Sequence, residues 1–152
     1  VVLDEPISSV DVFIGHLGQW KGTFRRLFTE LPYLFVSHDL SVVECISDRV
    51  AVMYLGKIVE VARTAELFHH PLHPYTTALF SSIPVPDPMV RRKRAPLTGE
   101  VPSPVNPPHG CRFHPRCSIA KNICRKEEPK LIDVGSEGNE HLVACHLLKN
   151  IF

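Results

Sequence analysis

The sequence VVLDEP, residues 1–6, is a short apolar run that ends in two adjacent carboxylates. Such a run predicts a strand buried on both faces, as in parallel sheets. A second run, YLFV at 33–36, is aromatic and β-branched and is followed by the polar sequence SHD. If the two strands are parallel, they end at the same edge of the sheet, where α/β folds bind ligands. We therefore expect Asp4, Glu5 and His38 to share that edge.

These three residue types suit phosphoryl transfer. One carboxylate can hold Mg²⁺, directly or through water, while its neighbour polarises an attacking water. A histidine beside them can sense or stabilise a terminal phosphate. The alternative is structural: Asp4 and Glu5 form a solvated strand end, and His38-Asp39 caps a helix. The joint spacing of the two motifs weighs against this alternative.

The periodicity of apolar residues and the positions of turn-forming residues predict further helices and strands. Residues 12–31 place apolar side chains near a 3.6-residue period and predict an amphipathic helix that ends at Pro32. A short helix capped by Asp39 or Ser41 should run through Ile46.

The strongest local signal is a hairpin. Two β-rich runs, residues 49–54 and 57–61, flank Leu55-Gly56. Beyond it, Thr64 is expected to cap a helix that runs to Phe68, and His73-Pro74-Tyr75 to open another that reaches about Ser82.

Composition narrows the class of protein. The 152 residues are 44% hydrophobic with a net charge of +1, which predicts a folded chain and gives no reason to expect nucleic acid as a partner. No apolar run has the roughly 20 residues of a membrane span, and no signal peptide is visible. Without a secretory signal, five cysteines indicate a metal or reactive thiols before disulfides.

Proline divides the chain, because nine of the fourteen prolines lie between Pro84 and Pro115. Residues 1–83 are predicted to form an α/β domain. Residues 84–110 are predicted to be an extended, proline-rich linker, and residues 111–152 a small, irregular, cysteine-containing segment.

Four cysteines have the spacing C-x5-C-x6-C-x20-C: Cys111, Cys117, Cys124 and Cys145. Four thiolates suffice for a cubane iron–sulfur cluster or a tetrahedral zinc site, and a small polar segment needs such a staple. One or two disulfides, or free thiols, are the alternatives.

Other histidine and cysteine side chains are weaker candidates for metal ligands. Four histidines could replace a thiolate in a zinc site, although each is more simply a surface residue: His109, His114, His141 and His146. Cys45 lies among apolar residues and is expected to be a buried structural thiol.

Several of these segments resemble one family. Residues 1–12 (VVLDEPISSVDV) resemble the Walker B segment and D-loop of ABC-transporter ATPases, and residues 33–43 (YLFVSHDLSVV) resemble their switch segment. Residues 47–88 and the sequence PPHGCRFHPRC at 107–117 are similar to the ATP-binding subunits of oligopeptide and dipeptide importers. The resemblance covers essentially the whole chain.

The resemblance implies roles for individual residues. Asp4 would lie near Mg²⁺, Glu5 would be the general base, and His38 would lie at the γ-phosphate of ATP, with Ser37 beside it. Asp11, in the D-loop, would contact the partner nucleotide-binding domain. Some members of the family bind a [4Fe–4S] cluster at the cysteine motif, which favours iron–sulfur over zinc.

The resemblance also implies a setting. The fold would be a partial ABC-ATPase nucleotide-binding domain of the P-loop NTPase type, with a small, mostly parallel sheet plus a hairpin and helices. Its partners would be a second nucleotide-binding subunit and transmembrane permease subunits, at the cytoplasmic, inner face of the cell membrane. The peptides transported do not follow from the sequence.

The sequence departs from the family in what it lacks. It contains no G-x-x-x-x-G-K-[ST] loop, Gln loop or Gly-rich signature segment, and its first residue is not Met. We therefore expect the C-terminal portion of such a subunit (a truncated product, a decayed copy or an excised fragment) with negligible ATPase activity alone. Apolar surface left uncovered would favour self-association. A different class of function is a non-catalytic, metal-bearing interaction module.

Overall fold

The computed structural model of this chain describes residues 2–4, 34–83, 99–136 and 138–148. The chain divides into two compact units, Val1–Asp48 and Arg49–Phe152. The expected helix at 12–31 and most of the expected linker, residues 84–98, lie outside the described residues.

The described residues of the first unit form two short strands and a helix. Strand β1 (Val2–Asp4) pairs in parallel with β2 (Leu34–Val36), so that Asp4 lies opposite Val36. The expected parallel pairing of these two runs is thus confirmed. Helix α2 (Leu40–Ile46) follows, and Asp39 caps it by accepting hydrogen bonds from the N–H groups of Ser41 and Val42.

The second unit is built on the predicted hairpin. Strands β3 (Arg49–Tyr54) and β4 (Lys57–Arg63) are antiparallel and joined by Leu55-Gly56. Both turn residues have positive φ, 45° at Leu55 and 77° at Gly56. Two positive φ values in a two-residue loop match the twist of the strands, so this turn closes a tight hairpin.

A β-bulge lies in the middle of β4. Met53 pairs with Ile58 but Val52 pairs with Glu60, so Val59 is an extra residue. Without it Glu60 would lie opposite Ala51, which is exposed, rather than opposite Val52, which is buried. The bulge therefore turns the side chain of Glu60 into the core.

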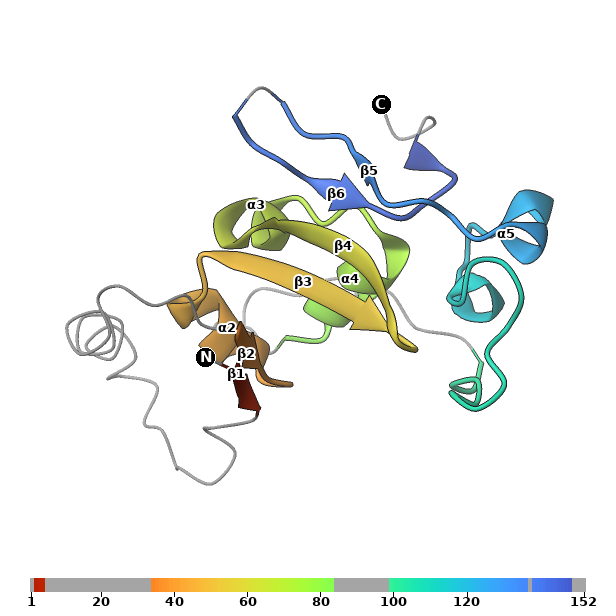
Figure 1. Ribbon diagram of the computed structural model, residues 1–152, viewed down its shortest axis with the longest axis horizontal. Coiled ribbons are helices and arrows are strands. Elements are labelled where there is room, and N and C mark those ends of the chain that lie inside the picture. Colours follow the sequence, from red (N-terminus) through yellow and green to blue (C-terminus); the bar gives the residue numbers. More distant parts are fainter. Residues whose placement is uncertain (1, 5–33, 84–98, 137, 149–152) are drawn as a thin grey trace, which may run out of the picture. The chain divides into compact units, whose positions relative to one another are not determined.

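The hairpin extends into a four-stranded sheet with the order β3-β4-β6-β5 (Figure 1). Strand β6 (Leu142–Val143) pairs antiparallel with β4, and β5 (Ile132–Asp133) pairs antiparallel with β6. The expectation of a mostly parallel sheet is wrong for the described residues, because only β1 and β2 pair in parallel. The neighbour of β4 on the side away from β3 is β6, which comes from near the C-terminal end of the sequence.

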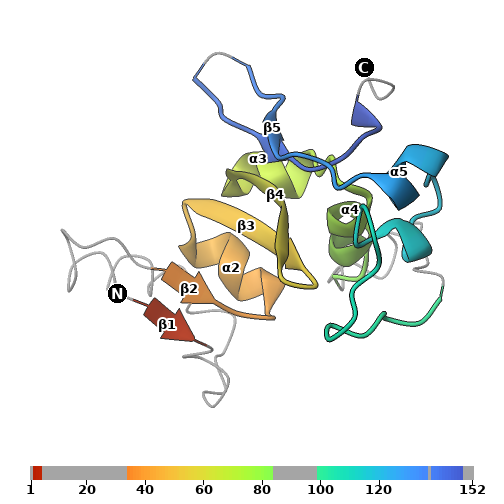
Figure 2. The same ribbon diagram turned by 45° about the vertical axis from the view of Figure 1, so that its right-hand side comes forward.

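Two helices follow the hairpin. Helix α3 (Thr64–His69) contacts β3 and β4, and its cap position is Arg63 rather than the expected Thr64. Helix α4 (Pro74–Ser81) begins where it was expected, and His73 caps it through Nδ1, which accepts from the N–H of Tyr75 at 3.1 Å. Figure 2 shows α4 together with the cysteine-containing segment.

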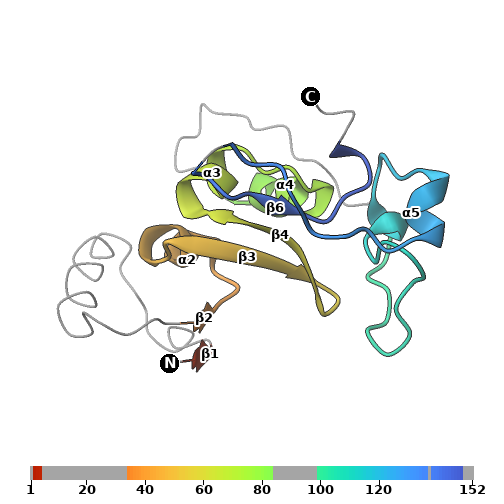
Figure 3. The ribbon, with the colours of Figure 1, turned by 45° about the horizontal axis from the view of Figure 1, so that its top comes forward.

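Residues 99–110 have no helix or strand, as predicted for the linker. The cysteine-containing segment is more regular than expected, with a 3₁₀ turn η2 (His114–Arg116) and a short helix α5 (Asn122–Lys126). It lies at the same end of the unit as the β3–β4 turn (Figure 3). Arg112 donates a hydrogen bond to the carbonyl of Leu55 there. Among the described helices, none has the length and apolar character that a membrane crossing requires.

Gly110 offers a test of this packing. Its φ is +70°, and an added Cβ would lie 2.5 Å from the carbonyl oxygen of Cys124. Gly138 has a φ of +84° but nothing within 4 Å of such a Cβ. We expect Gly110→Ala to lower the free energy of unfolding by about 2–3 kcal/mol and Gly138→Ala by only about 1 kcal/mol. Denaturant unfolding measures both, and equal losses would contradict the close approach at Gly110.

Candidate functional site

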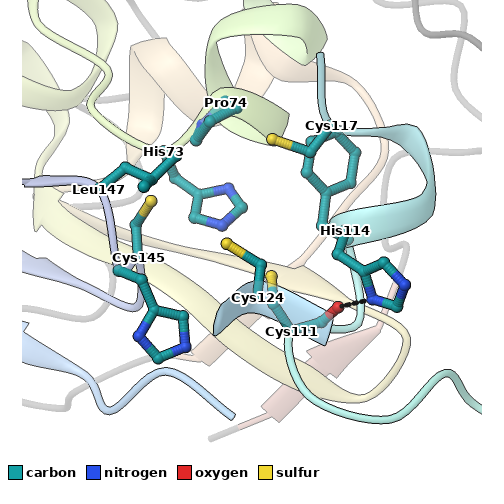
Figure 4. Close-up of a pocket in the computed structure, with 10 residues that line it drawn as sticks. His73, Pro74, Cys111, His114, Cys117, Cys124, Cys145 and Leu147 are labelled. Carbon is teal, nitrogen blue, oxygen red and sulfur yellow. Dashed lines mark hydrogen bonds between the residues drawn. The ribbon is translucent and has the colours of Figure 1, made fainter. Parts of the chain in front are cut away.

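The four cysteines of the C-x5-C-x6-C-x20-C pattern line one small pocket: Cys111, Cys117, Cys124 and Cys145. Figure 4 shows their sulfur atoms spread around the ring of His73 in this view. The other lining residues include Pro74, Phe113 and Leu147, and none of the lining residues is a carboxylate. The structure thus brings together all four cysteines that the sequence singled out.

Three of these cysteines are held by their own segment. The N–H of Cys111 donates to the carbonyl of Cys124 at 2.8 Å, which closes residues 111–124 into a loop. Two successive turns lie inside this loop: the N–H of His114 donates a hydrogen bond to the carbonyl of Cys111, and the N–H of Cys117 donates one to the carbonyl of His114. Phe113, 2% exposed, anchors the loop and packs edge-on against Tyr54 of β3.

The surroundings of Cys111, Cys117 and Cys145 disfavour the thiolate form of these three side chains. Burial raises the pKa of Cys111 to about 11, and it also raises the pKa of Cys117 and Cys145. Neighbouring cysteines raise all three pKa values further, because thiolates close together repel. A cation that bound there would have to displace protons from these thiols.

Within the described ranges, no three His, Cys, Asp or Glu side chains are placed so that they could hold one metal ion. The histidines named from the sequence do not change this. His114 and His146 line the pocket, but Nδ1 of His114 donates to the carbonyl of Cys111 and Nε2 of His146 to that of Glu127. His109 is exposed and does not line the pocket.

His141 was expected at the surface, and that expectation is wrong. It is 3% exposed, and its Nε2 lies 2.7 Å from Oε1 of Glu60, which is fully buried. The same carboxylate accepts hydrogen bonds from the N–H groups of Leu72 at 2.7 Å and His73 at 3.0 Å. Three donors thereby offset the cost of burying a carboxylate.

Sequence reasoning missed Glu60 and the position of His73 in the pocket wall. Glu60 is a charged residue inside the apolar run IVEVA, and this position could have indicated a buried carboxylate. Alternation along the hairpin would place it outward, and only the bulge at Val59 turns it inward. Cys45, in the first unit, was expected to be buried, but it is partly exposed, and it is not among the residues that line the pocket.

The other candidate site residues follow the two parallel strands. Asp4 ends β1, and Ser37 and His38 come directly after β2, so these residues lie at the same edge of the pair. The hydroxyl of Ser37 accepts a hydrogen bond from the N–H of Asp39 at 3.0 Å. Glu5 and Asp11 lie outside the described residues.

A comparison with known protein families finds a match for the part of the chain that contains most of the residues of the cysteine pocket. Residues 59–124, from the bulge in β4 to the third pocket cysteine, match the family described as "Oligopeptide/dipeptide transporter, C-terminal region". This match covers 66 of the 152 residues of the chain. The expected resemblance to the C-terminal part of an oligopeptide or dipeptide transporter's ATP-binding subunit is thereby confirmed.

Relatives of the transporter family match nearly the whole chain. The oligopeptide transport ATP-binding protein AppF of Bacillus subtilis is 50% identical over 151 residues, which are 97% of this chain and 44% of AppF. The dipeptide transport ATP-binding protein DppF of Haemophilus influenzae is 48% identical over 147 residues, 95% of this chain and 43% of DppF. The chain spans less than half the length of these relatives.

His73 makes the stability of the second unit depend on pH. Burial lowers the pKa of His73 from 6.5 to about 4. The unfolded chain therefore binds more protons between these values, and stability is lost as the pH falls through this window. We expect this histidine to contribute about 3 kcal/mol of that loss.

His73→Asn isolates the effect, because asparagine keeps a capping oxygen for α4 but does not titrate. Urea unfolding between pH 7 and pH 4 should show a clearly smaller loss of stability in this variant than in the wild type. The same pH dependence in both proteins would contradict the buried, neutral histidine.

Proposed function

We propose that this chain is part of the ATP-binding, energy-coupling subunit of an oligopeptide or dipeptide ABC importer. The observation that carries the proposal is its 47–50% identity, along nearly all of its length, to proteins named as peptide transport ATP-binding proteins. The parallel pairing of β1 and β2, which brings Asp4 and His38 to one strand edge, supports it. The fold of the first unit is then a portion of a P-loop NTPase domain.

In this proposal the strand edge acts on bound ATP. Mg-ATP supplies the transferable phosphoryl group and its charge. Asp4 orients the hydrated cation, Glu5 holds the proton of the attacking water, and His38 with Ser37 stabilises charge that develops at the terminal phosphate. Asp11 contacts the partner domain. The groups that cradle the other phosphates are not among the 152 residues, so this chain alone hydrolyses no ATP.

The proposed setting is the cytoplasmic face of the cell membrane. There the subunit pairs with a second nucleotide-binding subunit and docks on transmembrane permease subunits. Self-association of the isolated chain would replace part of that pairing. The word "transport" in the names of the relatives supports this setting.

A fusion tests the catalytic roles. When this chain replaces the matched part of AppF, we expect the fusion to hydrolyse ATP. His38→Ala should lower the turnover by about 100-fold or more, because a group that stabilises charge at the phosphate is lost. Asp39→Asn, next to it, keeps the cap of α2 and should retain the activity. Equal activity of His38→Ala and Asp39→Asn would contradict the role of His38.

We further propose that the pocket cysteines hold an iron–sulfur cluster. Their chemistry fits, since four thiols with no lining carboxylate form a soft donor set. The resemblance of residues 107–117 to the cysteine motif of importer subunits, some of which bind a [4Fe–4S] cluster there, favours a cluster over a single zinc. A cluster would be held by Cys111, Cys117, Cys124 and Cys145.

Anaerobic loading with iron and sulfide tests the cluster. We expect bound iron and a broad visible absorption in the wild type, and their loss in Cys124→Ser, whose side chain lines the pocket. Cys45→Ser is the matched control, because Cys45 does not line the pocket, and it should load like the wild type. Colourless protein with stoichiometric zinc would decide for zinc, and colourless, metal-free protein would contradict both metals.

A second candidate function is a non-catalytic, metal-bearing interaction module. It is favoured by the position of the whole cysteine pocket in the second unit, whereas Asp4 and His38 belong to the first. Titration of the chain with Mg-ATP distinguishes the two. Affinity abolished by Asp4→Asn would support the ATPase role, and no affinity with metal lost on Cys111→Ser would support the module.

A further inference from the structure

One pocket cysteine is held differently from the other three. Cys111, Cys117 and Cys124 belong to a single loop that is closed by its own backbone hydrogen bonds. Cys145 comes 21 positions later and reaches the pocket only by way of β6. Its position therefore depends on how β6 is attached to the rest of the unit.

The attachment of β6 is short. Only two residue pairs join it to β4, Glu60 with Val143 and Val61 with Leu142, and the N–H of Ala144 adds a hydrogen bond to the carbonyl of Val59 at 2.9 Å. A two-residue strand has little to set its register, and a slip by one residue turns every side chain to the other face. On its other side β6 pairs with β5, which is itself a two-residue strand at the end of the sheet and therefore adds little to fix the register against β4.

The side chain of Glu60 adds a constraint from within the core. Its Oε1 lies 2.7 Å from Nε2 of His141, the residue immediately before β6, and both side chains are buried. The bulge at Val59 places Glu60 on the buried face, next to the strand that leads to Cys145. A slip of β6 would break this buried pair, which would leave the buried ring nitrogen of His141 without its partner and the carboxylate of Glu60 with two donors instead of three. Such a loss is costly.

The same carboxylate also holds another part of the pocket lining. The N–H of His73 donates to Oε2 of Glu60, and that of Leu72 donates to Oε1. The ring of His73 lines the pocket and caps α4. One side chain therefore connects the start of α4 to the strand that leads to Cys145.

We infer that Glu60 and His141 form a positioning pair that places the thiol of Cys145 as the fourth ligand of the cluster. The inference rests on the proposed cluster. Neither residue is a ligand in it. Without the pair, the loop from Cys111 to Cys124 still presents three thiols, while Cys145 leaves its place.

The test counts cysteines that bound cluster protects. Wild type and variants are loaded anaerobically with iron and sulfide and treated with iodoacetamide, and mass spectrometry identifies the alkylated positions. Glu60→Gln cannot accept all three hydrogen bonds, because its amide nitrogen has no acceptor site. We expect four protected pocket cysteines in the wild type. In Glu60→Gln we expect alkylation of Cys145 to be at least ten-fold faster, while the other three stay protected.

Three further variants separate positioning from general loss of stability. His141→Leu removes the donor and should expose Cys145, whereas His141→Gln restores a donor and should protect it again. Val59→Ala removes buried apolar volume on the same strand while it keeps the backbone of the bulge, its hydrogen bond to Ala144 and both side chains of the pair. It should keep all four cysteines protected. If Glu60→Gln does not fold, the contrast between His141→Leu and His141→Gln decides.

The outcomes are distinct. Protection of Cys145 in both Glu60→Gln and His141→Leu would overturn the positioning role while leaving the cluster in place. Loss of protection at all four cysteines, in Val59→Ala as much as in the other variants, would overturn it as well, because the role would then be merely structural. A wild-type chain in which no cysteine is protected would overturn the cluster proposal and this inference together.

Discussion

The buried carboxylate of Glu60 is the constraint on which the second unit depends. It is fully buried and accepts hydrogen bonds from Leu72, His73 and His141, which come from two distant parts of the chain. A buried ion network adds little net stability compared with an apolar core, but breaking one side of it is costly. Its effect is to exclude other arrangements of β6 and α4. The bulge at Val59 makes this network possible, because it turns Glu60 inward.

The cysteine pocket has a consequence for folding. Burial and mutual proximity raise the pKa values of Cys111, Cys117 and Cys145, so the metal-free chain keeps these thiols protonated at neutral pH. A metal or cluster that binds there would exchange protons for metal–sulfur bonds, and its binding free energy would add to the stability of the loop. Such coupling suits a small polar segment with few core residues of its own.

Local features of the fold could be predicted from sequence, and distant pairings could not. The Leu55-Gly56 hairpin, the Asp39 cap and the start of α4 at Pro74 follow from turn and cap chemistry that acts over a few residues. The antiparallel place of β6 beside β4 depends on partners some 80 residues apart, which no local pattern encodes. The cysteine spacing singled out the pocket residues correctly. The buried position of Glu60 was not predicted, because the alternation of side chains along a strand without a bulge places Glu60 on the exposed face.

Glu60 joins β6 and the start of α4 into a single cooperative element around the cysteine pocket. Native-state hydrogen exchange can test this cooperativity at two amides: that of His73, which donates to Glu60, and that of Ala144, which donates to Val59 of β4. We predict similar opening free energies for the two amides, and an equal increase in both when the chain is loaded with iron and sulfide. Amides that open independently, with loading protecting one and not the other, would contradict it.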